Sequence, residues 1–256
     1  ALMEALEELR LAAGRGAVVF TLVNQDSAEL VRNAAAWMKD WGKAPVVCKD
    51  TPGFIVNRVA RPYYGESLRI YEEGWASMAE IDQAMRQYGG FRMGPFELMD
   101  LIGNDINFTV TRTVWEAFYY DPRYRPSLTQ QRQMESGRLG RKTGQGFYDH
   151  TGTTPPSAPQ VPEALGRAIV ERVLALLINE AVDAVFWQVA SPVDIETAMT
   201  KGVNYPKGLL AWGDEAGAAH WLGVLERLQA RYGDDRYRPG VLLRDKPASN
   251  AKLLEA

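Results

Sequence analysis

Residues 54–71 read FIVNRVARPYYGESLRIY, and this stretch decides the fold. Apolar residues recur along it at helical spacing, at Ile55, Val59, Tyr63, Leu68 and Tyr71. The spacing predicts a helix that is kinked or locally broken at Pro62, because a proline removes a backbone donor and crowds the preceding turn. Helical spacing continues beyond this stretch, so we predict a mainly α chain from Phe54 onward.

The residues before Phe54 have a different pattern. The predicted elements are a helix over residues 2–13, a strand over 17–23, a helix from about 27 to 41 and a strand over 44–50. The strands are short, apolar and rich in β-branched side chains. A short α/β segment is therefore expected to precede the helical part.

Composition excludes several classes of function. The 29 basic and 32 acidic side chains leave a net charge of −3, which is too weak a field to favour nucleic acid or an anionic membrane as a partner. No apolar run approaches the roughly 18 residues that cross a bilayer. The start, Ala1-Leu2-Met3-Glu4, has neither the basic region nor the apolar region of an export signal. Cys48 is the only cysteine, so an intrachain disulfide is impossible and a cytoplasmic location is expected. Ala1 suggests a chain that begins inside a larger protein or has been processed.

The chain aligns with itself when it is shifted by 114 residues. The matching pairs include Glu66 and Glu180, Ser77 and Ser191, Ile81 and Ile195, Met85 and Met199, Gly94 and Gly208, Asp100 and Asp214, and Gly103 and Gly217. Two amphipathic helices share apolar positions by default, but paired glycines and aspartates at fixed spacing indicate an internal repeat. The copies should pack as a pseudo-twofold pair. Residues 151–162, rich in Gly, Pro, Ser and Thr, read as a linker before a helix that starts near Glu163.

Several motifs resemble the C-terminal domain of the 3-hydroxyacyl-CoA dehydrogenases. The motifs are KDTPGFIVNR (49–58), MGPFELMDLIGND (93–105) and GRLGRKTGQGFY (137–148), and their order and spacing match the family. GVNYPKGLLAWG (202–213) resembles the tandem repeat of bacterial members that act in phenylacetate breakdown or on short 3-hydroxyacyl-CoAs. The resemblance implies two repeated helical domains of the 6-phosphogluconate-dehydrogenase C-terminal type.

With this resemblance, four segments are expected. They are an α/β remnant of a dinucleotide-binding domain at 1–48, a first C-terminal domain at 49–150, the linker at 151–162 and a second C-terminal domain at 163–256. In the intact family enzyme, NAD accepts a hydride from the L-3-hydroxyacyl-CoA and the 3-ketoacyl-CoA is formed.

The sequence departs from the family where the catalytic half would be. Family members open with a G-x-G-x-x-G turn that holds the pyrophosphate at a helix N-terminus, whereas Gly14-Arg15-Gly16 lacks the third glycine. The family base is a His held by a Glu, but His150 and His220 lie in unrelated settings and are expected at the surface or at helix ends. No NAD is therefore expected to bind this chain alone.

Asn57 and Arg58 are the candidate site residues. The resemblance places Asn57 near the thioester, where an amide can polarise a carbonyl, although it could instead be a satisfied polar residue in a first helical turn. Arg58 could bind a carboxylate or a CoA phosphate, or form a structural ion pair. Residues 138–148 could bind an anion, but a tight structural loop is favoured. Asp100 and Asp214 are expected to cap or bridge helices, and no cluster has metal-ligand spacing.

Two functions from different classes remain open. The favoured one is the acyl-CoA-binding and dimer-forming part of a 3-hydroxyacyl-CoA dehydrogenase in fatty-acid or phenylacetate-type β-oxidation. The alternative is a noncatalytic interaction or scaffold protein that kept the helical repeat, and a truncated form of the enzyme is a third reading. A homodimer is expected from single-repeat members, but a tandem copy could fill that role within one chain.

Overall fold

The computed structural model describes residues 28–152, 158–249 and 252–255, and these residues are mainly helical with no strand among them. The first half contains α2 (Ala28–Asp40), α3 (Val56–Val59), α4 (Arg61–Glu72), α5 (Met78–Gln87), α6 (Pro95–Ile102), α7 (Asn104–Ala117) and α8 (Leu128–Glu135). The second half contains α9 (Glu163–Phe186), α10 (Pro192–Thr197), α11 (Leu209–Ala216), α12 (Ala218–Tyr232) and α13 (Val241–Ser249). The short turns are η1 (Pro122–Tyr124), η2 (Arg141–Thr143), the π-helical η3 (Ala198–Gly202), η4 (Asp235–Tyr237) and η5 (Leu253–Glu255). The predicted mainly α fold is confirmed.

The α/β prediction for the N-terminal part is wrong where the structure tests it. Residues 44–50 form no strand with any described residue, although their composition suits one. A strand needs a neighbour to satisfy its backbone, and here the backbone N–H of Lys49 instead donates to the carbonyl of Val189, 2.7 Å away, beyond the end of α9. The predicted helix at 2–13 and strand at 17–23 lie outside the described residues. The helix predicted over 27–41 is confirmed as α2.

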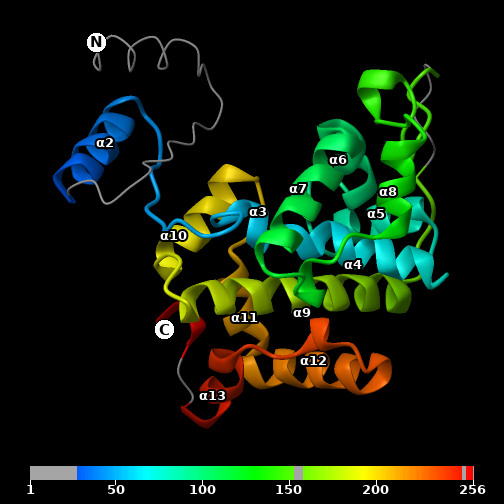
Figure 1. Cartoon of the computed structure of the whole chain (residues 1–256). Coiled ribbons are helices and arrows are strands. Elements are labelled where there is room, and N and C mark those ends of the chain that lie inside the picture. Colours follow the sequence, from blue (N-terminus) through cyan, green and yellow to red (C-terminus); the bar gives the residue numbers. More distant parts are fainter. Residues whose placement is uncertain (1–27, 153–157, 250–251, 256) are drawn as a thin grey trace.

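Helix α9 is the central helix of the described residues and packs against both halves. Its 24 residues are buried around most of the circumference, as expected of a helix that is apolar on every face. It contacts α3, α4 and α5 from the first half and α11, α12 and α13 from the second. In Figure 1 it crosses the molecule, with α4 to α8 on one side and α12 and α13 on the other. The buried apolar residues of both halves form a single cluster.

The break at Pro62 is confirmed. Helix α3 ends at Val59, and α4 begins at Arg61 with the proline in its first turn. At this position the missing proline N–H has no helical partner to lose. Ala60 connects the two helices with an α-helical backbone conformation, so the helix is interrupted but the chain does not turn back.

The same helix-capping arrangement occurs in both halves, at positions related by the 114-residue shift. Asp82 accepts a hydrogen bond of 2.8 Å from the Phe96 N–H, and Glu196 accepts one of 2.9 Å from the Leu210 N–H. Each carboxylate also accepts the N–H of the next residue. A carboxylate at a helix N-terminus satisfies free donors and interacts favourably with the helix dipole.

This arrangement explains the paired glycines. A Cβ added to Gly94 would lie 2.3 Å from the Asp82 side chain, and one added to Gly208 would lie 1.5 Å from the Glu196 carboxylate. No side chain fits where a carboxylate packs so closely against the helix start. Gly94 is therefore required by packing, and a side chain at position 208 would have to displace the Glu196 carboxylate from the helix start.

Asp82 gives the fold a predicted pH dependence. Burial raises its pKa to about 7, although hydrogen bonds from Tyr148 and from the start of α6 oppose the shift. The unfolded carboxyl has a pKa of about 3.9, so between these values the folded chain holds a proton that the unfolded chain has lost. We expect the free energy of unfolding to fall as pH rises from about 4 to 7, by at most about 1.4 kcal/mol per pH unit from this group.

Urea denaturation at several pH values in this range, for wild type and Asp82→Asn, measures the contribution. The variant cannot bind the extra proton, so its stability should change less steeply with pH. Equal slopes for the two proteins would show that Asp82 does not contribute.

Candidate functional site

Asn57 lies on the surface of the helical body. It occupies the second position of α3, and its side chain is exposed and makes no hydrogen bond with any described residue. A tight turn precedes α3, in which Gly53 and Phe54 have positive φ values of 77° and 49°. A Cβ on Gly53 would lie 2.9 Å from the backbone nitrogen of Arg58, so this turn packs directly against the helix start. The amide of Asn57 is thus held on a short, fixed element and is free to meet a ligand.

Arg58, the neighbouring candidate, lies in the interior. It is 4% exposed, its Nε lies 3.4 Å from Glu180 Oε2, and its guanidinium stacks over the Phe118 ring. Of the two roles left open by the sequence, this geometry matches the structural ion pair. The structure therefore does not bring Asn57 and Arg58 together around one ligand.

The Arg58–Glu180 pair has a counterpart in the other half. Glu66 accepts hydrogen bonds of 2.6 Å from Arg172 Nε and 2.8 Å from the Tyr237 hydroxyl. Glu180 likewise pairs with Arg58 and accepts a 2.7 Å bond from the Tyr124 hydroxyl. Each half contributes a glutamate to the other half's arginine and tyrosine, which is the reciprocal pattern of a twofold interface.

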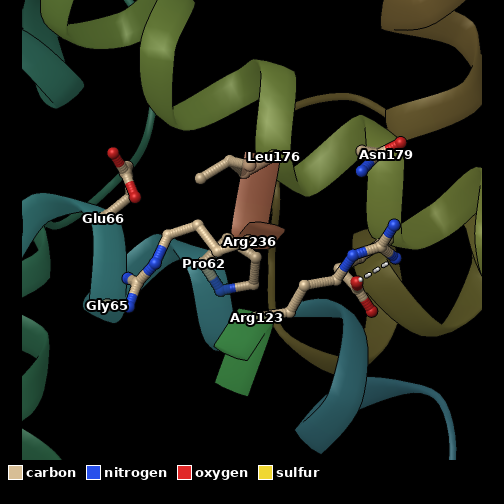
Figure 2. Close-up of a pocket in the computed structure, with 8 residues that line it drawn as sticks. Pro62, Gly65, Glu66, Arg123, Leu176, Asn179 and Arg236 are labelled. Atoms are coloured by element: carbon tan, nitrogen blue, oxygen red, sulfur yellow. Dashed lines mark hydrogen bonds and ion pairs between the residues drawn. The ribbon is translucent and has the colours of Figure 1, made fainter. Parts of the chain in front are cut away.

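A small cavity of about 20 Å³ lies where the two halves meet. Its lining consists of residues related by the repeat, in the pairs Pro62 and Leu176, Gly65 and Asn179, Glu66 and Glu180, and Arg123 and Arg236 (Figure 2). This volume holds about one water molecule. The paired glutamates were visible in the sequence repeat, but their partners were missed, although Arg58 and Arg172 share the same offset.

Asp100 anchors the 138–148 loop. Its fully buried carboxylate accepts hydrogen bonds of 2.9 Å from the N–H groups of Phe147 and Tyr148, and another from Asn104. Phe147 packs edge-on against Phe96. The predicted structural loop is confirmed. The prediction that Asp100 bridges helices is confirmed, because this residue of α6 is bonded to Asn104 at the start of α7; its bonds to the loop backbone were not predicted.

The second-half equivalent, Asp214, was also predicted to cap or bridge helices. It accepts hydrogen bonds from the N–H groups of Leu253, at 2.6 Å, and Leu254, which open the short helix η5. It therefore caps a helical turn.

The two histidines differ in environment. His150 Nε2 lies 2.8 Å from Asp100 Oδ2 and the side chain is 22% exposed, so the prediction of a surface or helix-end residue is wrong for His150. His220 is in the first turn of α12 and is 40% exposed, with Nε2 at 3.1 Å from Glu171, as predicted. The two histidines thus pair with Asp100 and Glu171, on different elements.

The described residues do not provide a dinucleotide site. Binding a pyrophosphate in the manner of the family requires a strand, a glycine turn and a helix, and the described ranges contain no strand. The described ranges therefore lack the strand on which the family builds its pyrophosphate-binding turn. Within the same ranges, no group of three or more His, Cys, Asp or Glu side chains is placed to hold a metal, and no helix is long and apolar enough to cross a membrane.

Comparison with known proteins agrees with the helical fold. The sequence model of the 3-hydroxyacyl-CoA dehydrogenase C-terminal domain matches twice, at residues 53–150 and 169–251. The chain is similar to the 3-hydroxyadipyl-CoA dehydrogenase of Escherichia coli (strain K12), with 37% identity, and the match covers 86% of this chain and 64% of the relative. It is also similar to the human mitochondrial hydroxyacyl-coenzyme A dehydrogenase, with 45% identity covering 44% of this chain and 36% of the relative.

A solved structure shows the same architecture. The crystal structure of 3-hydroxybutyryl-CoA dehydrogenase from Escherichia coli K12 superposes with a TM-score of 0.81 and 35% identity, covering 87% of this chain and 65% of that chain. The chain belongs to the 3-hydroxyacyl-CoA dehydrogenase family. It spans just under two thirds of these two bacterial relatives.

Proposed function

We propose that this chain is the substrate-binding and dimer-forming portion of an NAD-dependent 3-hydroxyacyl-CoA dehydrogenase. The whole enzyme would oxidise an L-3-hydroxyacyl-CoA to the 3-ketoacyl-CoA in fatty-acid or phenylacetate-type β-oxidation, in the cytoplasm. The double family match supports this assignment. The amide of Asn57 carries the proposal: it is exposed, has no hydrogen-bond partner among the described residues, and stands where the resemblance places the family's substrate-facing asparagine.

The reaction assigns different proposed roles to this chain and to the NAD-binding part of the enzyme. When bound to its own module, NAD would accept the hydride from C3, and a base must take the 3-hydroxyl proton. The base is proposed to come from the rest of the enzyme, because His150 is bonded to Asp100, whose carboxylate anchors the 138–148 loop, and His220 pairs with Glu171 in the second half. The role proposed for this chain is to orient the thioester through Asn57, whose amide can donate to the thioester oxygen.

The dimer is a separate part of the proposal. Reciprocal contacts between Glu66 and Arg172, and between Glu180 and Arg58, occur within one chain, so the tandem copy can supply the interface that a single copy would make with a partner subunit. Sedimentation velocity distinguishes a chain that is complete as a monomer from one that pairs through another surface.

Replacing Asn57 by Ala should weaken the binding of acetoacetyl-CoA about three- to tenfold, because one hydrogen bond to the ligand is lost. Isothermal titration calorimetry measures the change. Glu171 is the matched control, since it occupies the equivalent position in the second half and pairs with His220. Glu171→Ala should bind like wild type, and equal losses in both variants would refute the role of Asn57.

A further inference from the structure

Three arginines converge on a single carboxylate oxygen near the interface of the two halves. Asp234 Oδ2 lies 3.2 Å from Arg125 Nη2, 3.5 Å from Arg69 Nη2 and 3.7 Å from Arg236 Nε. These contacts, together with a hydrogen bond from the Arg236 backbone N–H, lower the pKa of Asp234 although burial opposes the shift. Asp234 is therefore ionised, and these four side chains together carry two positive charges in excess. Glu66 and Glu73, which also act on Arg236 and Arg69, share the single charge of Arg172.

Arg236 is the least satisfied member of the cluster. The residue is 5% exposed, and no group in the described part of the chain accepts a hydrogen bond from its guanidinium; its Nε, like that of Arg123, is buried without a hydrogen-bond partner and lies 3.7 Å from Asp234 Oδ2. Burial, followed by repulsion from Arg69, lowers the pKa of Arg236 to about 10. Buried guanidinium groups ordinarily have acceptors for most of their five donors.

The equivalent arginine in the other half has different partners from Arg236. Arg123 is the repeat equivalent of Arg236, and it pairs with Glu180, Asp183 and the carbonyl of Arg238. The position of Asp183 is occupied in the first half by Arg69. The exchange of an aspartate for an arginine leaves Arg236 with Asp234 Oδ2 at 3.7 Å and the nearby charge of Glu66, and with an arginine where Arg123 has a third anion.

The cluster faces a groove that is large enough for a ligand. The groove has a volume of about 630 Å³ and its lining includes Arg69, Arg125, Arg236, Phe108, Trp115 and Met134. Figure 2 shows the Arg236 guanidinium beside Gly65, which also lines the groove and has no neighbour within 4 Å of an added Cβ. Trp115 Nε1 is a further buried donor without a partner among the described residues.

Two glutamates also line the groove, but both are engaged with neighbouring groups. Glu72 accepts hydrogen bonds from the Ser127 hydroxyl and the Thr129 N–H, and Glu135 accepts one from Gln131. They hold the start and the side of α8. Among the described residues, Asp234 is the carboxylate that Arg69, Arg125 and Arg236 all contact.

We propose that Arg69, Arg125 and Arg236 form a binding site for a phosphate group, separate from Asn57. A phosphate dianion matches the excess charge of the cluster, and arginine offers the donor geometry that phosphate oxygens prefer. The apolar wall of Phe108, Trp115 and Met134 fits an organic group attached to the phosphate. The ligand class is a phosphate monoester.

The test is calorimetric titration of the whole chain with inorganic phosphate and with phenyl phosphate, at constant ionic strength. Arg125→Gln should weaken binding about tenfold, because a charge-assisted contact is lost. Arg238→Gln is the matched control: it is the repeat equivalent, pairs with Asp121 and should leave phosphate affinity unchanged. Tighter binding of phenyl phosphate assigns the site to an ester, and equal binding assigns it to free phosphate.

Arg69→Asp distinguishes a ligand site from a structural cluster. The substitution restores the arrangement seen around Arg123, so it should abolish phosphate binding while stabilising the chain in phosphate-free buffer. The proposal is overturned if wild type shows no saturable binding of either probe, because the groove would then hold only water. It is also overturned if Arg69→Asp binds as wild type does.

Discussion

Replacing Arg172 by Met is expected to lower the free energy of unfolding by about 3–5 kcal/mol, the usual cost of removing one partner from a buried ion pair. Arg172 is 2% exposed and bonds Glu66, both carboxylate oxygens of Glu73, and the hydroxyls of Tyr232 and Tyr237. Its loss leaves Glu66, which is 1% exposed, as an unpaired charge in the interior.

Urea denaturation gives the loss, and Arg167→Met is the matched control. Arg167 lies on the same helix and pairs with Glu163, but its side chain is 68% exposed. Such a surface pair contributes less than about 1 kcal/mol. Similar losses for the two variants would contradict the account in which reciprocal arginine–glutamate contacts hold the halves together.

Replacing Asp100 by Ala is expected to cost about 3–4 kcal/mol, because the 138–148 loop loses its anchor and two buried backbone N–H groups are left without an acceptor. The carboxylate has four partners: Phe147, Tyr148, Asn104 and His150. Phe147 would also lose its fixed position against Phe96.

The repeat provides the control for this prediction as well. Asp214 holds only the N–H groups of Leu253 and Leu254, near the C-terminal end, so Asp214→Ala should cost less, about 1–2 kcal/mol. Thermal or urea unfolding measures both. A larger loss for Asp214→Ala than for Asp100→Ala would show that the loop is not held as described.

Helical periodicity and the repeat were sufficient to predict the mainly α fold. The pairs Gly94 and Gly208, and Asp100 and Asp214, were visible because packing requires particular residue types at those positions. The break at Pro62 followed from proline geometry alone. These features depend on local chemistry, which a sequence displays directly.

Features that depend on distant partners were not predictable in this way. Residues 44–50 have the composition of a strand, but no described strand lies beside them. Arg58 is buried against Glu180, which is 122 residues away in sequence, and His150 is held by Asp100. The exchange of Asp183 for Arg69 across the repeat can be read from the sequence, but the contacts of Arg236 and Arg123 that give it meaning cannot.

Acetoacetyl-CoA titrated into the wild-type chain in a calorimeter tests the central claim most directly. Asn57 occurs in the first half, and the second half carries Glu171 at the equivalent position. The proposal predicts saturable binding of one ligand per chain. Absence of binding would favour a scaffold that has lost substrate recognition, and two equal sites per chain would contradict the assignment of the thioester contact to Asn57.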